Sequence, residues 1–270
     1  MLRAAARARI AALDADVLLA HVLGVGREQL YAHPEAPVSA DEAARFETLV
    51  GRRANGEPVP YLTGEREFHG LTFHVDSRVL VPRPETETLV DHAIEIARRT
   101  RARLAVDLGT GSGAIAVSLA VALPHLRLIA IDSSIGALGV AASNALRHGV
   151  AERIALRRGD LLQALVRPVD LVCANLPYLP ESAEAGWIGE RAALRFEPRE
   201  ALLGGPDGLA LVRRAVGDLP RVLAPGGAAL FEIDPDQAEV VAALLAPLGE
   251  TRIVSDLAGD ARVVIVTRAR

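Results

Sequence analysis

The chain has 270 residues, of which half are hydrophobic and 24% are charged. This length predicts a main domain with a smaller one beside it, and the composition excludes a disordered, collagen-like or coiled-coil protein. The 34 acidic residues outnumber the 30 basic ones and give a net charge of −4. Because nucleic-acid binding relies on a basic surface, this balance disfavours indiscriminate contact with nucleic acid.

The single cysteine, Cys173, lies in an apolar run that is typical of a buried strand. One cysteine forms no internal disulfide, which suits a reducing compartment. The N-terminus lacks the apolar segment of a secretory signal, and no run of about 18 apolar residues occurs that would predict a transmembrane helix. We therefore expect a cytoplasmic protein that makes no contact with a membrane.

Residues 1–64 predict a small helical domain. Apolar residues recur at helical spacing from Arg3 onward, and Gly24 is suited to end the first helix. A second helix is expected over Asp41–Ala54, with Ser39 near its start as the cap. Turn-forming residues then mark the exit from this domain.

Residues 65–84 are expected to link this domain to the next. The stretch Phe68–Val81 is rich in β-branched and aromatic residues and is interrupted by a glycine, which predicts a short β-hairpin. A proline-led helix follows, and Glu85 and Glu87 fall in its first turn, where negative charge complements the helix dipole.

Residues 85–270 predict an α/β domain. Unbroken apolar runs alternate with amphipathic helical segments, which indicates a mostly parallel sheet covered on both faces. We expect a doubly wound fold with a seven-stranded sheet, whose last two strands form an antiparallel edge. The expected strands are 104–108, 126–131, 154–157, 170–174, 228–233, 252–254 and 263–267, and the expected helices between them are 113–122, 135–147, 209–219 and 237–245.

A glycine-rich loop stands directly between the first strand of this sheet and the following helix. Gly109, Gly111 and Gly113 alternate with Thr110 and Ser112, so the backbone can approach a ligand closely beside the free N–H groups of the helix end. The loop also satisfies the loose dinucleotide pattern G-x-G-x-x-A. The loop alone therefore predicts a nucleotide-like cofactor without deciding which one.

Three aspartates narrow the choice of cofactor. Asp132 ends the second strand, where its carboxylate can accept hydrogen bonds from both ribose hydroxyls of NAD or of S-adenosylmethionine. Asp107, just before the loop, favours S-adenosylmethionine, because a carboxylate suits a positively charged amino-acid moiety better than a pyrophosphate. Asp160 follows the third strand and would reach the adenine amino group, although a solvated loop aspartate is about as consistent with its position.

The fourth strand delivers Asn175, Leu176, Pro177 and Tyr178 to the carboxyl edge of the sheet, beside the glycine loop. The Asn175 amide oxygen and the Leu176 carbonyl are two acceptors that can hold both N–H groups of a planar nitrogen and turn its lone pair toward a methyl donor. Pro177 stiffens the turn, and Tyr178 can stack on a flat substrate. This element predicts methylation of a carboxamide or an arylamine.

The sequence resembles the HemK/PrmC family, the methyltransferases that modify the glutamine of the Gly-Gly-Gln motif in class I peptide chain release factors. The resemblance covers nearly the whole chain. The motifs that carry it are Gly56-Glu-Pro, Tyr61-Leu-Thr-Gly64, Glu67-Phe68, Val81-Pro-Arg-Pro-Glu-Thr-Glu87, Asp107-Leu-Gly-Thr-Gly-Ser-Gly113, Phe196-Glu-Pro198, Gly204-Gly205, Asp207-Gly208, and Glu232-Ile233 with Gln237.

The resemblance implies a Rossmann-like class I S-adenosylmethionine-dependent methyltransferase domain. It implies that residues 109–113 and Asp132 bind the cofactor, that Leu161 lines the cofactor site through an apolar contact, and that Asn175 binds the substrate amide. It also implies that the N-terminal helical domain helps to dock the release factor. We expect a monomer with no direct contact to nucleic acid and no bound metal.

One departure from the family pattern leaves alternatives open. The family usually has Asn-Pro-Pro-Tyr, whereas Leu176 stands at the second position here and keeps only the backbone carbonyl. Asn-Leu-Pro-Tyr is similar to the motif of RNA adenine dimethyltransferases, so an adenine amino methyltransferase acting on RNA or DNA is one alternative. A non-catalytic adapter for release factor or ribosome is a second, and a nicotinamide oxidoreductase is a third.

Overall fold

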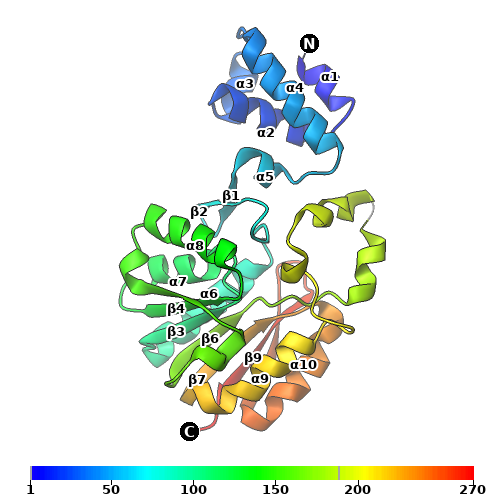
Figure 1. Ribbon diagram of the computed structural model, residues 1–270. Helices are drawn as coiled ribbons and strands as arrows, with labels where there is room; N and C mark the ends of the chain where they lie inside the picture. Colours follow the sequence, from blue (N-terminus) through cyan, green and yellow to red (C-terminus); the bar gives the residue numbers. More distant parts are fainter. Residues whose placement is uncertain (1, 188) are drawn as a thin grey trace. The chain divides into compact units, whose positions relative to one another are not determined.

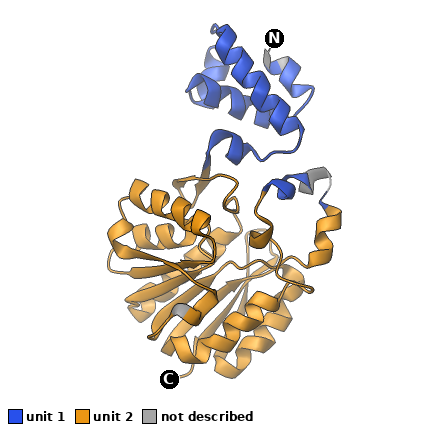
Figure 2. Ribbon diagram, viewed as in Figure 1, with its two compact units in different colours: residues 1–65, 187–196 blue, residues 66–186, 197–270 orange. Residues whose placement is uncertain are grey.

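The computed structural model describes residues 2–187 and 189–270 (Figure 1). The chain divides into a smaller unit, residues 1–65 with 187–196, and a larger unit, residues 66–186 with 197–270 (Figure 2). No helix in the described part of the chain is both long enough and apolar enough to span a bilayer.

The smaller unit is helical, as predicted. Its α4 begins after Ser39, whose side chain accepts a hydrogen bond from the Glu42 N–H in a capping box, and α2 ends at Gly24 in the left-handed conformation. Leu18 and Phe46 are fully buried in its core. The helices are α1 (Leu2–Arg7), α2 (Ala12–Leu23), α3 (Arg27–Ala32), α4 (Ala40–Ala54), α5 (Val59–Thr63) and the 3₁₀ helix η4 (Gly189–Phe196).

A buried carboxylate ties the N-terminal helices together. Asp16 accepts hydrogen bonds from the Arg3 Nε at 3.0 Å, the Arg7 Nη2 at 2.7 Å and the Tyr31 hydroxyl at 2.5 Å. Burial opposes ionisation of Asp16, but these bonds outweigh it and lower its pKa to about 2. The ionised carboxylate therefore persists throughout the physiological pH range.

The hairpin is shorter than predicted and begins earlier. Its strands are β1 (Glu65–Phe68) and β2 (Leu71–His74), and the turn passes through His69 and Gly70, both at positive φ. A hairpin is present as expected, but its predicted extent over 68–81 was wrong, because the chain after His74 runs as a loop. Its β-branched residues, Val75 and Val79 among them, are buried in the core instead of paired in a ladder.

The larger unit contains the predicted doubly wound sheet of seven strands. The strand order is β5-β4-β3-β6-β7-β9-β8, and β9 alone runs antiparallel to its neighbours β7 and β8. The antiparallel edge expected from the last two strands is confirmed. The bounds are β3 (Leu104–Leu108), β4 (Arg127–Asp132), β5 (Ile154–Arg158), β6 (Val169–Ala174), β7 (Leu223–Glu232), β8 (Gly249–Ser255) and β9 (Ala261–Arg268).

Helices cover both faces of this sheet (Figure 1). α6 (Thr86–Thr100), α7 (Ala114–Ala122) and α8 (Ile135–Arg147) pack on one face, while α9 (Ala210–Val222) and α10 (Ala238–Leu245) pack on the other. Short 3₁₀ helices complete the connections: η1 (Ala151–Arg153), η2 (Leu161–Ala164), η3 (Glu181–Gly186), η5 (Arg199–Ala201), η6 (Pro235–Gln237) and η7 (Ala246–Leu248).

The central strands are buried on both faces, as apolar parallel strands require. Cys173 lies in β6, between Asp107 of β3 and Leu230 of β7, and its side chain is fully buried. Because β3, β4 and β6 run parallel, their carboxyl ends meet at one edge of the sheet.

Candidate functional site

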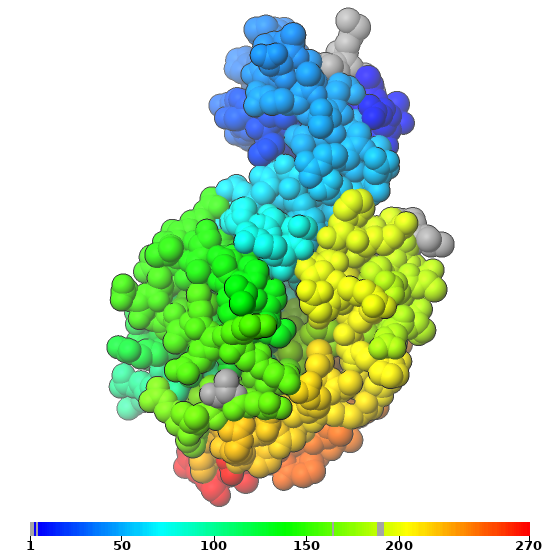
Figure 3. Space-filling view, in the orientation of Figure 1, coloured from blue at the N-terminus to red at the C-terminus, as the bar shows by residue number. Residues whose placement is uncertain are grey.

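A pocket with about 1070 Å³ of empty space opens at this carboxyl edge, entirely within the larger unit. In the space-filling view it forms a hollow between the green and the yellow atoms of that unit (Figure 3). The glycine loop, the strand ends and the segment before α6 all contribute to its wall. The predicted site residues among its lining are Gly109, Thr110, Gly111, Ser112, Asp132, Asp160, Leu161, Asn175, Leu176 and Pro177.

The glycine loop depends on backbone conformations that other residues rarely adopt. Gly109, Gly111 and Gly113 all have positive φ, at 72°, 53° and 81°. A Cβ on Gly113 would lie 3.1 Å from the Ala141 Cβ, so a side chain there would also crowd α8. These positions explain the alternating glycines that the sequence showed.

Asp107 lies below this loop and is fully buried. Its Oδ2 accepts hydrogen bonds from the Thr110 hydroxyl at 2.5 Å and from the Ala116 N–H at 3.1 Å. Its Oδ1 has no hydrogen-bond partner among the described residues. Burial raises the pKa of Asp107 to about 7, which leaves this carboxyl poised to respond to a nearby positive charge.

Asp132 ends β4 and holds the loop from the other side. Its Oδ2 accepts the Gly111 N–H at 2.9 Å and its Oδ1 accepts the Ser134 N–H at the same distance. Ser134 in turn caps α8 by accepting a hydrogen bond from Ala137. A carboxylate has about four acceptor positions, so Asp132 retains capacity for two hydroxyl groups of a ligand.

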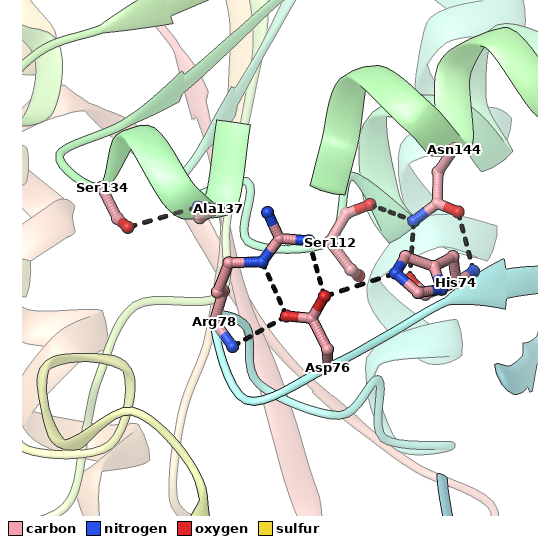
Figure 4. Close-up of polar contacts among 7 residues, drawn as sticks. All are labelled: His74, Asp76, Arg78, Ser112, Ser134, Ala137 and Asn144. Atoms are coloured by element: carbon pink, nitrogen blue, oxygen red, sulfur yellow. Dashed lines mark hydrogen bonds and ion pairs between the residues drawn. The ribbon is translucent and has the colours of Figure 1, made fainter. Parts of the chain in front are cut away.

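Asn144 of α8 joins the glycine loop to the hairpin (Figure 4). Its Nδ2 donates to the Ser112 carbonyl at 2.8 Å and to the His74 carbonyl at 2.9 Å, and its Oδ1 accepts the His74 N–H at 2.8 Å. This fully buried residue was not predicted as part of the site. A lone amide within the apolar sequence of that helix was the available signal.

Arg78 contributes to the pocket wall from the loop after the hairpin. Its Nε and Nη2 donate to the two carboxylate oxygens of Asp76, at 2.8 Å and 2.6 Å, and lower the pKa of Asp76 to about 2 (Figure 4). The side chain of Arg78 packs over Gly136, where a Cβ would lie 3.4 Å from its Cδ. Neither Asp76 nor Arg78 was predicted as a site residue.

Asp160 and Leu161 form the wall after β5. Asp160 is exposed and forms an ion pair with Arg214 of α9, with its Oδ2 2.5 Å from the Nη2. Leu161 has a φ of 51°, a left-handed conformation unusual for leucine, and is half-buried at the pocket. The structure therefore places both residues at the pocket, with Asp160 already engaged by a cation.

The Asn175 side chain occupies the end of the pocket where β6 stops. Its Nδ2 donates to the Thr86 hydroxyl at 3.0 Å, while its Oδ1 makes no hydrogen bond to the part of the chain that the structure describes. Leu176 is buried, and its Cδ2 lies 3.2 Å from the position of a Cβ on Gly109. The Leu176 side chain therefore lies close to Gly109 of the glycine loop.

Tyr178 lies outside the described lining of the pocket. Its carbonyl accepts the Gln237 Nε2 at 2.9 Å, and burial raises the pKa of its hydroxyl to about 12. A Cβ on Gly208 would collide with this carbonyl, and one on Gly204 would collide with that of Pro177. Gly204 and Gly208 are therefore required for the close approach of their loop to the backbone of Pro177 and Tyr178.

The segment Val81–Glu87 forms another wall of the pocket, with Pro82, Arg83 and Thr86 among the lining residues. The buried Glu197 carboxylate anchors it by accepting the Val81 N–H at 3.0 Å and pairing with Arg83. Glu87 does more than complement the helix dipole, because its Oε1 accepts the His69 N–H at 2.9 Å.

Two family models match the chain. The one described as the PrmC N-terminal domain matches residues 2–64, and the methyltransferase small domain matches residues 85–193. The ribosomal protein L11 methylase of Lactobacillus delbrueckii subsp. bulgaricus has a similar fold, with a TM-score of 0.53 at 21% identity over 73% of this chain and 84% of that one. The fold and the domain match define a class I S-adenosylmethionine-dependent methyltransferase.

Curated relatives identify the family. The chain is 40% identical over 262 residues to the release factor glutamine methyltransferase of Nitratidesulfovibrio vulgaris, which covers 95% of this chain and 88% of the relative. It is 43% identical over 255 residues to that of Bordetella pertussis, which covers 93% of both chains. The chain belongs to the release factor glutamine methyltransferase family, and its cofactor is S-adenosylmethionine. The resemblance seen in the sequence is thereby confirmed.

Proposed function

We propose that the chain methylates the side-chain amide nitrogen of the glutamine in the Gly-Gly-Gln motif of class I peptide chain release factors. The observation that carries this proposal is the Asn175 amide at the pocket wall, whose nitrogen donates to Thr86 while its oxygen has no hydrogen bond to the described residues. The activity named for the relatives, at about 40% identity over nearly the whole chain, supports the same substrate.

The nucleophile in this reaction is an amide nitrogen, whose lone pair is delocalised into the carbonyl and is therefore weakly nucleophilic. S-adenosylmethionine supplies an electrophilic methyl group. The Asn175 Oδ1 and the Leu176 carbonyl each accept one N–H of the substrate amide, which fixes the plane of the amide and turns its lone pair toward the cofactor side of the pocket. Catalysis by these two acceptors is therefore positioning combined with electrostatic stabilisation of the cationic product.

No general base has to act before the transfer. The two N–H groups become more acidic as positive charge develops on nitrogen, so both acceptors bind the product-like state more tightly than the substrate. The cationic product then loses its proton to solvent water. Pro177 keeps the turn rigid, so that the Leu176 carbonyl stays directed at the substrate. In this proposal Tyr178 lies behind the pocket wall and supports the turn, because its carbonyl accepts a hydrogen bond from Gln237.

The residues of the glycine-loop end fit S-adenosylmethionine. The unpaired Oδ1 of the buried Asp107 suits a positively charged amino-acid group, and Asp132 has free acceptor positions for the two ribose hydroxyls. Residues 109–113 bring backbone amides close to the ligand. In the proposed complex Leu161 packs on the adenine ring and Asp160 accepts from its amino group.

The N-terminal domain, residues 1–64, is proposed to help dock the release factor, with residues 65–84 as linker to the catalytic domain, residues 85–270. We place this reaction in the cytoplasm, where release factors act, and assign it to a monomer. No contact with nucleic acid or with a membrane enters the mechanism.

Transfer of labelled methyl from S-adenosylmethionine tests the proposal. A purified class I release factor is compared with a copy whose Gly-Gly-Gln glutamine is replaced, and with ribosomal RNA. Label on the intact factor alone supports the proposal. Label on RNA would move the chain to the adenine-modifying enzymes, and cofactor binding without transfer to any of the three would support the adapter function instead.

A further inference from the structure

The Asn175 amide contacts a buried pair of side chains that the transfer step itself does not use. The Thr86 hydroxyl accepts from the Asn175 Nδ2 at 3.0 Å and also lies beside the Glu232 carboxylate, whose pKa it lowers. Thr86 is 4% exposed and Glu232 is 1% exposed. The Oε2 of Glu232 has no hydrogen-bond partner among the described residues.

The fold brings these three side chains together from separate elements. β6 and β7 are parallel neighbours with Ala174 opposite Phe231, so Asn175 and Glu232 follow at matching levels at the carboxyl edge. Thr86 is the first residue of α6, which packs against both strands. The Pro-Arg-Pro segment before it delivers the hydroxyl to the gap between the two strand ends.

The hydrogen-bond directions in this chain are mutually determined. An ionised carboxylate only accepts, so we infer that the single hydroxyl proton of Thr86 points to the neighbouring Glu232. The Thr86 oxygen can then only accept from Asn175, which commits the Asn175 nitrogen to Thr86. The amide oxygen of Asn175 is thereby left for the pocket, and an amide turned over would present a nitrogen there instead.

We propose that Thr86 and Glu232 are positioning residues that hold the Asn175 amide with its oxygen directed at the substrate. This inference rests on the proposed function, because the orientation matters when the substrate presents N–H groups. A turned-over amide would place its own N–H against the N–H of the substrate, and the acceptor pair would be lost.

Protonation of Glu232 reverses this arrangement. A neutral carboxyl can donate to the Thr86 oxygen, which frees the hydroxyl proton of Thr86 to face the Asn175 oxygen and favours the turned-over amide. Burial raises the pKa of Glu232 to about 7, opposed by the nearby Arg262 and Arg83 and assisted by Glu85. Tyr178 also faces this group. The active orientation is therefore favoured above pH 7 and is lost as the pH falls through that value.

Two variants of Thr86 separate positioning from packing. Thr86→Val preserves the shape but removes the hydroxyl, and we expect kcat to fall about tenfold to hundredfold while the Kd of S-adenosylhomocysteine stays within about twofold. Thr86→Ser keeps the hydroxyl and should retain kcat within about threefold. A kcat that is the same in Thr86→Val and Thr86→Ser would overturn the proposal.

Glu232→Gln tests the second residue through the pH profile at saturating cofactor. In the wild type kcat should fall on the acid side of about pH 7, the pKa of Glu232. The variant has no titrating group at this position, so its kcat should vary less than about twofold between pH 6 and 8.5. An acid limb that is unchanged in the variant would show that Glu232 does not set the orientation.

Amide spectra decide the inference without any turnover. The chain contains three asparagines, Asn55, Asn144 and Asn175, so selective ¹⁵N labelling gives a side-chain spectrum that can be fully assigned. The Asn175 NH₂ signals should shift with a midpoint near pH 7 in the wild type and stay fixed in Glu232→Gln, with Asn144 as the internal control. Signals of Asn175 that shift alike in both proteins would contradict the proposal.

These spectra also keep the two proposals distinguishable. If the wild type transfers no methyl to the release factor while the Asn175 signals still follow Glu232, the proposed substrate is wrong and the positioning pair stands. If transfer occurs but the signals ignore Glu232, the substrate stands and the positioning pair is wrong.

Discussion

At the glycine-loop end of the pocket backbone groups hold the shape, whereas at the Asn175 end side chains from three elements do. The loop is fixed by positive φ angles at its glycines and by backbone N–H groups that Asp132 accepts. Asn175 is fixed through a hydrogen bond to Thr86, which lies beside the buried Glu232 carboxylate. The glycine-loop end is therefore determined by residues close together in sequence, whereas the Asn175 end depends on the tertiary fold.

Both ends nevertheless contain a fully buried carboxyl with one unpaired oxygen. These are Asp107 and Glu232, and burial raises the pKa of each to about 7. At the loop end the carboxyl is suited to a charge on the cofactor, while at the other end it acts on the substrate through two intermediate side chains. The same electrostatic cost therefore supports direct binding at one end of the pocket and indirect positioning at the other.

Removing the acceptor at the Asn175 end should have the largest effect on activity. Asn175→Ala is expected to lower kcat about 10³-fold, because one of the two groups that orient the amide is lost. Cofactor binding is governed by the other end, so the Kd of S-adenosylhomocysteine by calorimetry should change less than about threefold. Near-normal turnover would show that Asn175 does not orient the substrate. A large loss of affinity would show that Asn175 also contributes to cofactor binding.

The buried carboxyl of Asp107, at the glycine-loop end, should make the free energy of unfolding depend on pH. Because the folded pKa of Asp107 is about 7 and lies above its usual value, its contribution to stability is complete at low pH and is lost as the pH rises through 7. Asp107→Asn should therefore raise the free energy of unfolding at pH 8 by about 4 kcal/mol relative to wild type, and much less at pH 5.

Denaturant unfolding of both proteins at several pH values checks this expectation. The residual slope of the variant between pH 5 and 8 should come from Glu232 and disappear in the double variant with Glu232→Gln. A difference between wild type and Asp107→Asn that is constant with pH would show that Asp107 is already ionised in the folded protein.

A matched pair of glycine substitutions isolates the loop backbone. Gly113→Ala combines a left-handed φ of 81° with a Cβ 3.1 Å from that of Ala141, whereas Gly149→Ala has a similar φ of 67° and nothing within 4 Å. Each should lose about 1–2 kcal/mol of stability from the backbone conformation. Only Gly113→Ala should also weaken S-adenosylhomocysteine binding, by about tenfold to hundredfold in calorimetry.

The point where the two ends touch should be the least sensitive. Leu176→Pro restores the residue that the family pattern has and keeps the carbonyl, but it removes the end of the side chain that lies beside Gly109. We expect kcat within about threefold of wild type and a loss of stability of about 1 kcal/mol. A loss of activity above about tenfold would mean that the leucine side chain itself, rather than the carbonyl, is needed in this chain.

Much of the fold followed from local sequence patterns. Helix Ile135–Arg147 and strand Leu104–Leu108 have the predicted bounds, because an amphipathic period or an apolar run is a property of consecutive residues. The hairpin of the linker was predicted but its extent was not, since Val75 and Val79 have strand-forming side chains yet are buried as a loop. Burial of that loop depends on tertiary packing, which the pattern does not contain.

The site divides in the same way. Asp132 and the glycines were found from their spacing, and the structure brings them together at one edge. Asn144 and Glu197 were missed, because each acts by hydrogen-bonding backbone groups distant in sequence. A buried polar side chain must satisfy its hydrogen bonds, so such partners become evident only when burial is known.

The thiol of Cys173 can report how often the centre of the sheet opens. It is the single thiol of the chain and lies fully buried in β6, two residues before Asn175, where burial raises its pKa well above the usual range of a thiol. A thiol reagent can therefore react only when the centre of the sheet opens. The rate of labelling therefore measures how often the sheet opens beneath Asn175. Any ligand that stabilises this part of the sheet slows the labelling.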